Sequence, residues 1–403
     1  MADKSVLISG IGIAGPTLAF WLHRAGFKPT LIERSPRLRT GGYVIDFWGL
    51  GYEIAERMGL IEDIHRAGYH MRELRIVDDR GERVAGFGPK VFGELTGGRY
   101  VTLGRSDLSR LLYEKAKDMT EVIFGDEIAG LQEQADGMRV RFKHGAERRF
   151  DLVMGADGLH SDVRRLAFGS DDRFEKQLGY AVAAFEVQGY RPYDEEIYVM
   201  YGQPGLMLGR FAMHDDRTLF LFVFTTGSDS LPATLEAQKA MLRQRYRGGK
   251  WECSRILSEL DRTRELYIDA VSQIRMESWS RGRVALTGDA AFCVSLLAGQ
   301  GSALAMISAY VLAGELASGD GGYAQAFVRY QAILQDYIGT KQRGAERLAP
   351  VFAPRTQWGL NFRNLVIKTF AIPGLAKFVA GRDIIDTLRL PDYRWPVLEN
   401  EAS

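Results

Sequence analysis

The sequence predicts an α/β protein in which a Rossmann-like nucleotide-binding domain is interrupted by an inserted antiparallel-sheet domain and followed by a C-terminal helical segment. Three observations predict this fold class. A glycine-rich turn joins a buried strand to a helix at the N-terminus, hydrophobic residues alternate with a period of two over 179–226, and a buried-strand pattern returns at 283–287. We expect the nucleotide-binding domain at 1–70, 99–175 and 271–345, the inserted substrate domain at 71–98 and 176–270, and the helical segment at 346–403.

Composition excludes several classes of protein. Of 403 residues, 46% are hydrophobic and 26% charged, as in a globular protein with a large core. The net charge of +1 argues against a nucleic-acid-binding surface. Cys253 and Cys293 form no C-x-x-C pair, which disfavours a disulfide scaffold, a zinc site and a dithiol redox centre. The chain opens directly on a strand and has no run of about eighteen apolar residues, so we expect a cytoplasmic protein without membrane insertion.

The nucleotide-binding motif opens the chain. An apolar run over 5–9 is followed by a G-x-G-x-x-G turn, a helix over 16–25 and a second strand over 30–33. The helix N-terminus offers unpaired N–H groups and a partial positive charge to phosphates. Five positions of this turn are expected to bind a dinucleotide: Gly10, Gly12, Ile13, Ala14 and Gly15.

Each glycine has its own task, and an acid completes the motif. Gly10 permits the tight turn, Gly12 lets the backbone approach a pyrophosphate, and Gly15 lets the helix pack close to the strand. Glu33 ends the second strand and can accept hydrogen bonds from the hydroxyls of an adenosine ribose. Arg34, the next residue, is expected to lie beside the nucleotide.

The chain then returns to the sheet. Arg34, Arg37 and Arg39 could meet phosphates or lie in a solvated loop. The glycine-rich residues 88–99 are expected to form a connection. Ser106 is expected to cap a helix over 107–117, and Arg105 before it points to the sheet end, either toward a phosphate or flavin edge or into a structural ion pair. A three-stranded meander over 128–152, typical of large flavoprotein nucleotide domains, follows and leads into Asp157-Gly158.

The inserted domain is expected to contain strands over 181–187, 197–201, 206–213 and 218–225. Phe220, Phe222 and Phe224 share one face of the last strand. They either fill the core or form the wall of a large apolar pocket, and a one-residue slip would turn Leu219, Leu221 and Val223 to the pocket instead. We expect the phenylalanines to bind substrate, together with three residues on neighbouring strands: Tyr180, Met207 and Arg210.

After a strand over 283–287 come Gly288-Asp289-Ala290-Ala291, then Gly299-Gln300-Gly301 and a helix from Ser302. A further helix is expected from about Tyr323 to Arg343. The C-terminal part, from Asn361 to Asp386, is apolar and amphipathic, with Pro373-Gly374 in its middle. Docking on the protein's own core is favoured over binding to a membrane surface.

Three widely separated motifs therefore stand in order. They are the G-x-G-x-x-G turn with Glu33, the stretch Gly155-Ala156-Asp157-Gly158-x-x-Ser161-x-x-Arg164, and Gly288-Asp289-Ala290-Ala291 with Gly299-Gln300-Gly301. In this order and spacing they resemble the FAD-dependent aromatic hydroxylases, the para-hydroxybenzoate hydroxylase-like flavin monooxygenases, over nearly the whole chain. Gly41-Gly42, Arg105-Ser106-Asp107-Leu108 and Phe362-Arg363-Asn364 most resemble the branch that includes tetracycline-inactivating monooxygenases.

The resemblance implies non-covalent FAD and assigns several residues to it. Asp289, after Gly288, resembles the acid that accepts a hydrogen bond from the ribityl chain. Asp157-Gly158 resembles the segment near the pyrophosphate that also serves a transient visit by NADPH (or NADH). Arg105 resembles the arginine that reaches FAD from its helix start. After Gly299, the helix from Gly301 and Ser302 would direct its positive end at the flavin and stabilise its reduced, negative form.

The resemblance also implies the reaction. NAD(P)H reduces FAD, O₂ adds to give the C4a-hydroperoxide, and its distal oxygen passes to an electron-rich ring. The flavin carries the chemistry, so we expect no catalytic side chain and no metal. His160, the one histidine within a motif, is expected on the surface. The implied substrate is an aromatic, phenolic or polyketide-like small molecule, and we expect a monomer or weak homodimer.

Two positions depart from the family pattern. Phe292 stands where the family usually carries His or Tyr, and Leu296, which we expect to border the substrate, stands where it usually carries Pro. Leu296 leaves the loop less constrained because proline fixes φ and lacks an N–H. A flavin-dependent reductase and a non-catalytic flavoprotein that binds a planar ligand stay open as alternatives. A halogenase is disfavoured because none of the six tryptophans forms W-x-W.

Overall fold

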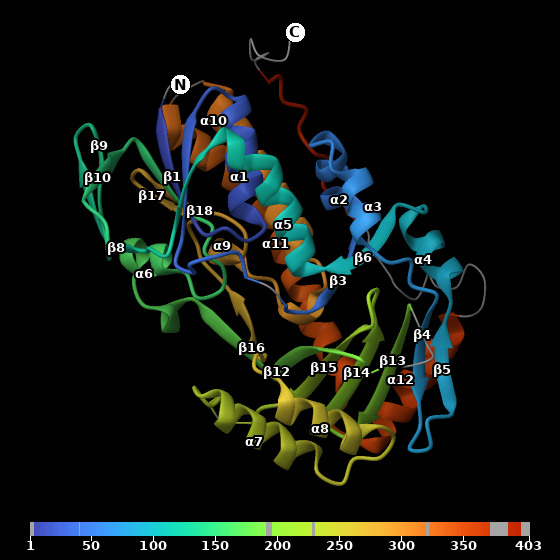
Figure 1. The fold of residues 1–403 in the computed structure, drawn as a ribbon. Coiled ribbons are helices and arrows are strands. Elements are labelled where there is room, and N and C mark those ends of the chain that lie inside the picture. Colours follow the sequence, from blue (N-terminus) through green and yellow to red (C-terminus); the bar gives the residue numbers. More distant parts are fainter. Residues whose placement is uncertain are drawn as a thin grey trace.

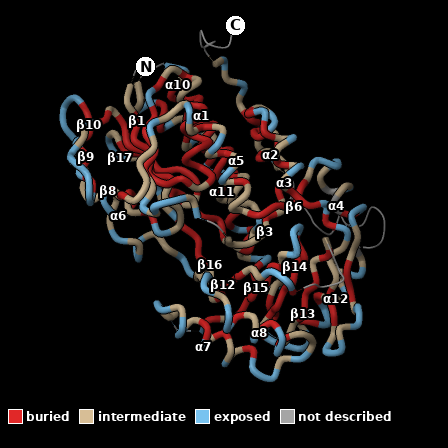
Figure 2. Tube along the Cα trace, in the orientation of Figure 1, coloured by how far each residue is buried: buried red, intermediate tan, exposed pale blue. Residues whose placement is uncertain are grey.

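The structure, a computed structural model, describes residues 4–39, 41–190, 196–227, 230–319, 322–370 and 386–395. Two lobes are visible in Figure 1. The upper lobe holds a parallel sheet and the helices around it, and the lower lobe holds a larger mixed sheet with two helices beneath it. The buried segments in Figure 2 gather along the strands of both sheets. The predicted fold class is confirmed.

The upper lobe is built on a six-stranded sheet. The N-terminal apolar run forms β1, where Val6, Leu7 and Ile8 are fully buried, as expected for a parallel strand covered on both faces. All neighbouring pairs are parallel except the last at one edge. The strand order is β17 (Ser280–Arg281), β18 (Val284–Leu286), β11 (Leu152–Gly155), β1 (Ser5–Ser9), β2 (Lys28–Glu33) and β7 (Glu121–Phe124).

Helices and smaller sheets surround this sheet. The helix α1 packs against both α5 and α10. The helices are α1 (Ala14–Arg24), α2 (Gly49–Arg57), α3 (Ile61–Ala67), α5 (Arg105–Ala116), α6 (Asp162–Phe168), α9 (Asp289–Phe292), α10 (Gly301–Ala317) and α11 (Gly322–Phe352). A two-stranded sheet pairs β3 (Val44–Trp48) with β6 (Tyr100–Gly104), and the meander consists of β8 (Ile128–Gln134), β9 (Gly137–Phe142) and β10 (Arg148–Phe150). Short 3₁₀ turns lie at Lys117–Met119, Asp171–Arg173 and Leu296–Ala298.

The lower lobe is built on a seven-stranded sheet. It is antiparallel except where β13 runs parallel to β4. The order is β16 (Tyr267–Ile274), β12 (Glu175–Gln188), β15 (Arg217–Thr225), β14 (Leu206–Ala212), β13 (Ile197–Gln203), β4 (Glu73–Val77) and β5 (Arg83–Phe87). Its strands therefore come from both stretches expected in the inserted domain. The exact domain boundaries stay a prediction.

Two local features were not expected. The stretch 88–99 contains a helix, α4 (Pro89–Thr96), because Pro89 occupies its first turn and Gly97 ends it in the left-handed conformation with φ +64°. The helix expected to start after Ser106 starts at Arg105, and its N-cap is Gly104, which leaves the Ser106 side chain within the first turn.

Two helices cover one face of the lower sheet. They are α7 (Leu235–Tyr246) and α8 (Cys253–Arg262), below the sheet in Figure 1. Phe220, Phe222 and Phe224 are fully buried and pack against apolar residues of these helices, among them Leu242, Tyr246, Ile256 and Leu260. The phenylalanine stripe is therefore core.

The C-terminal region begins with α11, which continues nine residues beyond the predicted end at Arg343, to Phe352. A further helix, α12 (Gln357–Phe370), packs on β5 of the lower sheet. The expected Pro373-Gly374 break lies outside the described residues. The segment 386–395 returns to the upper lobe, where the Tyr393 hydroxyl donates to Glu315 at 2.7 Å. In the described part of the chain, every helix is too short or too polar to cross a bilayer.

Candidate active site

One pocket runs through the upper lobe to the edge of the lower sheet, and the space between its walls, counted out into the solvent, is about 1610 Å³. It collects residues from both ends of the chain. The predicted residues that line it are Gly10, Gly12, Ile13, Ala14, Glu33, Arg34, Arg105, Asp157, Gly158, Asp289, Leu296, Gly299, Gly301 and Ser302.

Two predicted glycines lie behind the pocket wall and act through packing. A Cβ on Gly15 would lie 1.9 Å from the carbonyl oxygen of Gly10, so the helix reaches the turn only without a side chain there. A Cβ on Gly288 would lie 3.2 Å from Ala14, and its φ is +60°. In contrast, a Cβ on Gly158 or Gly299 would meet no atom within 4 Å, so these glycines face open space.

Two helices direct uncapped N-termini into the pocket. Neither α1 nor α10 has a side-chain cap or an acidic residue in its first turn. Ile13 and Ala14 at one terminus, and Gly301 and Ser302 at the other, line the cavity. Buried helix ends require partners for their first N–H groups. Two positive ends facing one cavity fit a ligand with anionic groups at two places, as FAD has in its pyrophosphate and its reduced ring.

Glu33 is oriented by the backbone of the turn. Its carboxylate accepts hydrogen bonds from the N–H groups of Ile11 and Ser35, both at 3.0 Å. Arg39 lies 3.5 Å from the same carboxylate, but its side chain is 63% exposed. The carboxylate thus has a fixed orientation beside the turn and keeps acceptor capacity for a ribose.

The second motif positions its loop through buried polar contacts. The Asp157 carboxylate accepts from the Ser161 hydroxyl at 2.5 Å and from Val163 N–H at 3.1 Å, while burial raises its pKa. Arg164 is fully buried and donates to the carbonyls of Leu159 and Ala290 and to Asp171. Because Leu159 lies beside Gly158, and Ala290 beside Asp289, Arg164 joins the second motif to the third.

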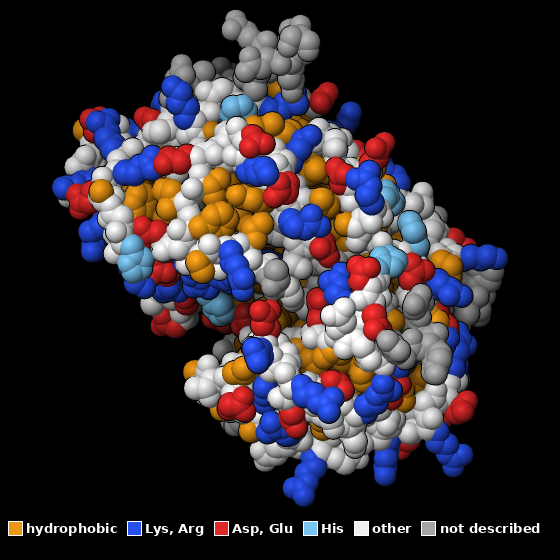
Figure 3. Space-filling model, viewed as in Figure 1, with side chains coloured by type: hydrophobic (Ala, Val, Ile, Leu, Met, Phe, Trp, Pro, Cys, Tyr) orange, Lys and Arg blue, Asp and Glu red, His pale blue; other side chains and the backbone are white. Residues whose placement is uncertain are grey.

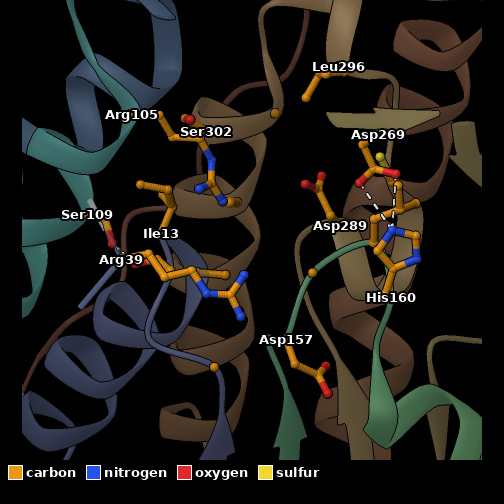
Figure 4. A pocket seen from close by; sticks show the side chains of 18 of the residues that line it. Ile13, Arg39, Arg105, Ser109, Asp157, His160, Asp269, Asp289, Leu296 and Ser302 are labelled. Carbon is orange, nitrogen blue, oxygen red and sulfur yellow. Dashed lines mark hydrogen bonds and ion pairs between the residues drawn. The ribbon is translucent and has the colours of Figure 1, made fainter. Parts of the chain in front are cut away.

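Aromatic and charged residues meet at the far end of the pocket. Arg105 N–H donates to the Tyr43 carbonyl at 3.0 Å, and a Cβ on Gly12 would lie 3.8 Å from the Arg105 guanidinium. The rings of Tyr43 and Tyr267 lie 5.7 Å apart. Burial raises the pKa of Tyr43 to about 12 and raises the pKa of Asp289, which the charge of Arg105 partly offsets. Figure 4 shows Arg105, Ile13 and Ser302 on one side of the cavity and Asp157 and His160 on the other.

One pair at the pocket was not expected. His160 is exposed, as predicted, and it also lines the cavity and lies 3.1 Å from Asp269 on β16 (Figure 4). The hydrogen bond to Asp269 raises the pKa of His160. The pair joins the loop after β11 in the upper lobe to a strand of the lower sheet. No sequence signal indicated it, because 109 residues separate the partners. Tyr43 and Tyr267 were likewise not predicted as site residues.

The predicted substrate residues divide between the two faces of the lower sheet. Tyr180 and Met207 lie in an apolar cluster with Leu296 and Leu297, on the face of the sheet toward the pocket. Of the predicted substrate residues, only Leu296 lines the cavity itself. Val223 and Leu221 share this cluster. The structure therefore has the alternative orientation of β15, in which the leucines and valine rather than the phenylalanines face the pocket side.

The other four predicted substrate residues point away from the pocket. Phe220, Phe222 and Phe224 face α7 and α8, and Arg210 forms a buried ion pair with Glu252 on that same side. Assigning these four to the substrate pocket was wrong, because α7 and α8 supply the apolar cover that the stripe requires.

The departure at Phe292 also has a structural explanation. Its side chain is 3% exposed and contacts the Trp279 ring, with centroids 4.7 Å apart. Phe292 therefore points into the core, whereas Leu296 borders the pocket.

Comparisons with known proteins agree with this geometry. The model of a family described as FAD binding domain matches residues 3–331. A Mycobacterium tuberculosis relative described as uncharacterized protein Rv1260 is 38% identical over 84% of this chain and 92% of its own length. A flavin-dependent monooxygenase from an unknown prokaryotic organism is 33% identical over 84% of this chain and 88% of its own length. The crystal structure of tetracycline destructase Tet(51) superposes with a TM-score of 0.81 at 29% identity, covering 98% of this chain and all of that one. The chain belongs to the FAD-binding-domain family, among its flavin-dependent monooxygenases.

Proposed function

We propose that this monooxygenase uses NAD(P)H and hydroxylates an aromatic, phenolic or polyketide-like small molecule. The observation that carries the proposal is the composition of the pocket's far end. There the paired rings of Tyr43 and Tyr267 line the cavity together with Leu296, which borders the apolar cluster of the lower sheet, and such a surface suits a large flat ring system.

FAD fits the residues that line the pocket. Ile13 and Ala14 would bind the pyrophosphate through α1, Glu33 the ribose, and Asp289 the ribityl chain. When bound, FAD supplies the O₂-activating chemistry of the reaction. The protein's own contribution is to orient the cofactor and to place the substrate ring beside it.

Two side chains at the far end of the pocket set its polarity, Leu296 and Tyr43. Leu296 closes one side with apolar surface that is continuous with the cluster on the lower sheet. Tyr43 is a neutral hydroxyl at neutral pH, as tyrosines ordinarily are, and burial, which raises its pKa to about 12, keeps it neutral in alkaline solution as well. Shielding of the reacting groups from water by this apolar surface would favour oxygen transfer to substrate over loss of oxidant to water.

The substrate class is further supported by a relative. The solved structure Tet(51) is named a tetracycline destructase, and a tetracycline is a multi-ring polyketide. We therefore place phenols and tetracycline-like compounds first among the candidates.

The test is a panel of phenols and tetracyclines incubated with purified enzyme, FAD and NADPH. We expect ligand-stimulated NADPH oxidation and a product mass increased by one oxygen atom for at least one compound. Hydrogen peroxide release without oxygenated product across the panel would reject the hydroxylase for those compounds, and a reduced product without added oxygen would identify a reductase instead.

NADPH should bind weakly near the adenine end, since the one glycine-rich nucleotide motif is assigned to FAD. Arg34 and Arg39 line that end of the pocket and Arg37 is exposed beside them. We propose that these arginines contact the 2′-phosphate of NADPH.

A further inference from the structure

The last described segment of the chain, residues 386–395, crosses the upper lobe without forming a helix or strand, and we call it the strap. In Figure 1 it runs from beside α2 toward the C-terminus, whereas α12, which precedes it in the sequence, packs on the lower sheet. Leu390 of the strap is 8% exposed and belongs to the hydrophobic core of the upper lobe. The strap is therefore a packed element of the fold.

The strap begins at Asp386, which joins two helices. Its carboxylate accepts a hydrogen bond from the Leu50 N–H in the first turn of α2, at 2.9 Å, and one from the Tyr337 hydroxyl of α11, at 2.5 Å. The same carboxylate lies 3.1 Å from the ammonium of Lys341, whose side chain is 4% exposed. A Cβ on Gly49 would lie 2.2 Å from this carboxylate, so the start of α2 leaves room for it. The strap thus supplies a cap to α2 and a counter-charge to a buried lysine of α11.

The second half of the strap packs on α10. The Tyr393 hydroxyl donates to Glu315, which is only 7% exposed. A Cβ on Gly314 would lie 2.1 Å from the Tyr393 ring, so the ring reaches the helix only because a glycine stands there. The carbonyl of Pro391 accepts a hydrogen bond from the Tyr310 hydroxyl at 3.0 Å. These contacts fix the strap at one position along α10.

Trp395 covers the contact between α1 and α10. Its ring centroid lies 4.7 Å from that of Trp21 on α1 and 5.7 Å from that of Tyr310 on α10, and the rings of Trp21 and Tyr310 lie 5.0 Å apart. Trp21 and Tyr310 are 2% and 0% exposed. Both helices direct their N-termini into the cofactor pocket. The strap therefore holds together, farther along, the same two helices whose N-termini face the cofactor.

Surface charge does not account for the position of the strap. Basic and acidic side chains are interspersed on the face shown in Figure 3, in keeping with the net charge of +1. The strap instead contacts buried rings and two buried charges, on Lys341 and Glu315. Because a buried charge is costly without its partners, release of the strap would leave each of these two charges short of one partner.

We propose that docking of the strap and binding of FAD stabilise each other. The helix α10 has 17 residues and is about 26 Å long at 1.5 Å per residue, so a shift of its N-terminus relative to α1 also shifts its remaining turns. FAD fixes the spacing of the two N-termini, and the strap fixes the same two helices through Tyr393 and Trp395. Two sites that constrain one pair of rigid helices are coupled, and the coupling is equal in both directions. Docking of the strap thus strengthens FAD binding, and protein without FAD releases the strap more often.

The test is the FAD affinity of the full-length apoprotein, measured by flavin fluorescence at a temperature where circular dichroism shows each variant folded. Trp395→Ala and Asp386→Asn should each raise the Kd for FAD roughly fivefold or more, the lower end of typical coupling between two sites. The matched controls make the same changes elsewhere. Trp358→Ala changes a residue of α12 that is 74% exposed, and Asp392→Asn changes an exposed residue of the strap itself. Both controls should bind FAD like the wild type.

Two further measurements separate coupling from a merely structural role. Trp395→Ala should lower the melting temperature more with FAD present than without it, and an equal fall in both conditions would reject the coupling. In the wild type, hydrogen exchange of the amides in 386–395 should be slower with FAD bound. An unchanged Kd in both strap variants, or equal exchange with and without FAD, would overturn the proposal. Substrate turnover enters none of these measurements, so this proposal and the proposed function can fail separately.

Discussion

Replacing Arg164 with methionine should destabilise the protein and empty its cofactor site. The side chain is fully buried and donates to two backbone carbonyls, Ala290 at 2.9 Å and Leu159 at 2.6 Å. Methionine fills similar space without donors, so both carbonyls lose their partner at a cost of about 1–3 kcal/mol each. The Asp171 carboxylate keeps its ion pair with Arg165 at 3.1 Å, so the loss of Arg164 costs it less than it costs the two carbonyls. We expect a total of about 3–5 kcal/mol, the range for breaking a buried pair.

The assay is thermal unfolding by circular dichroism with and without FAD, together with FAD affinity measured by flavin fluorescence. At about 2 °C per kcal/mol, the apparent melting temperature should fall by roughly 6–10 °C. FAD should bind at least roughly tenfold more weakly, since each 1.4 kcal/mol is a factor of ten and both tethered loops line the pocket.

Arg165→Met is the matched control. Arg165 is the next residue, forms ion pairs with Asp162 and Asp171, and has a 42% exposed side chain. Exposed pairs contribute only about 0–1 kcal/mol, so this variant should melt close to the wild type and retain FAD. If Arg164→Met behaves like Arg165→Met, the joining of the two motifs through Arg164 is not what holds the pocket together.

Four further outcomes are expected. Glu33→Ala should weaken FAD binding by about 1.5–3 kcal/mol, roughly 10–150-fold in Kd, through a lost charge-assisted bond to the ribose; unchanged flavin content after gel filtration would contradict this role. Alanine variants of Arg34, Arg37 and Arg39 should raise KM for NADPH and leave KM for NADH unchanged. Equal catalytic efficiency with NADPH and NADH in the wild type and in all three variants would reject these contacts. The pKa of His160 is higher in the folded protein than in the unfolded chain, where it is near 6.5. The pairing of His160 with Asp269 therefore stabilises the fold fully below the unfolded pKa, and this stabilisation is lost as the pH rises through the folded pKa. Asp269→Asn should lower the melting temperature at pH 5–6 and have no effect well above neutrality. Both free thiols are buried, and burial raises the pKa of Cys253 to about 12 and also raises the pKa of Cys293. Iodoacetamide should therefore label neither thiol at pH 8 until the protein is unfolded. Rapid labelling of the native protein would show that one thiol is accessible.

The N-terminal half of the site could be predicted because its chemistry is local. In the turn from Gly10 to Gly15, glycine spacing, the buried strand and the following helix all constrain the same few residues. The structure shows why no other residue fits at Gly15, where a Cβ would overlap the Gly10 carbonyl. Asp289 and Gly301 were predicted in another way, through the resemblance of their motifs to the family, and both line the pocket.

The remainder depends on contacts between distant segments. A period of two identifies the two faces of β15 but does not say which one the helices α7 and α8 will cover, and Phe220 faces them. Arg210 on β14 pairs with Phe220 on β15, so the face that Phe220 takes also decides the side on which Arg210 lies. The pairing of His160 with Asp269, and of Tyr43 with Tyr267, links residues whose sequence neighbours give no hint of each other.

The order of strands in the upper sheet has a consequence for synthesis on the ribosome. β1 lies at the centre of the sheet, yet its neighbour β11 is made more than 140 residues later, and β18 more than 270 residues later. A nascent chain that ends before β18 would expose the edge of β11 and lack the helix α10. The cofactor cavity is therefore completed only late in translation, and until then the exposed edge of β11 is a place where the emerging chain can aggregate. Truncations before residue 317 should accumulate as insoluble protein without bound flavin.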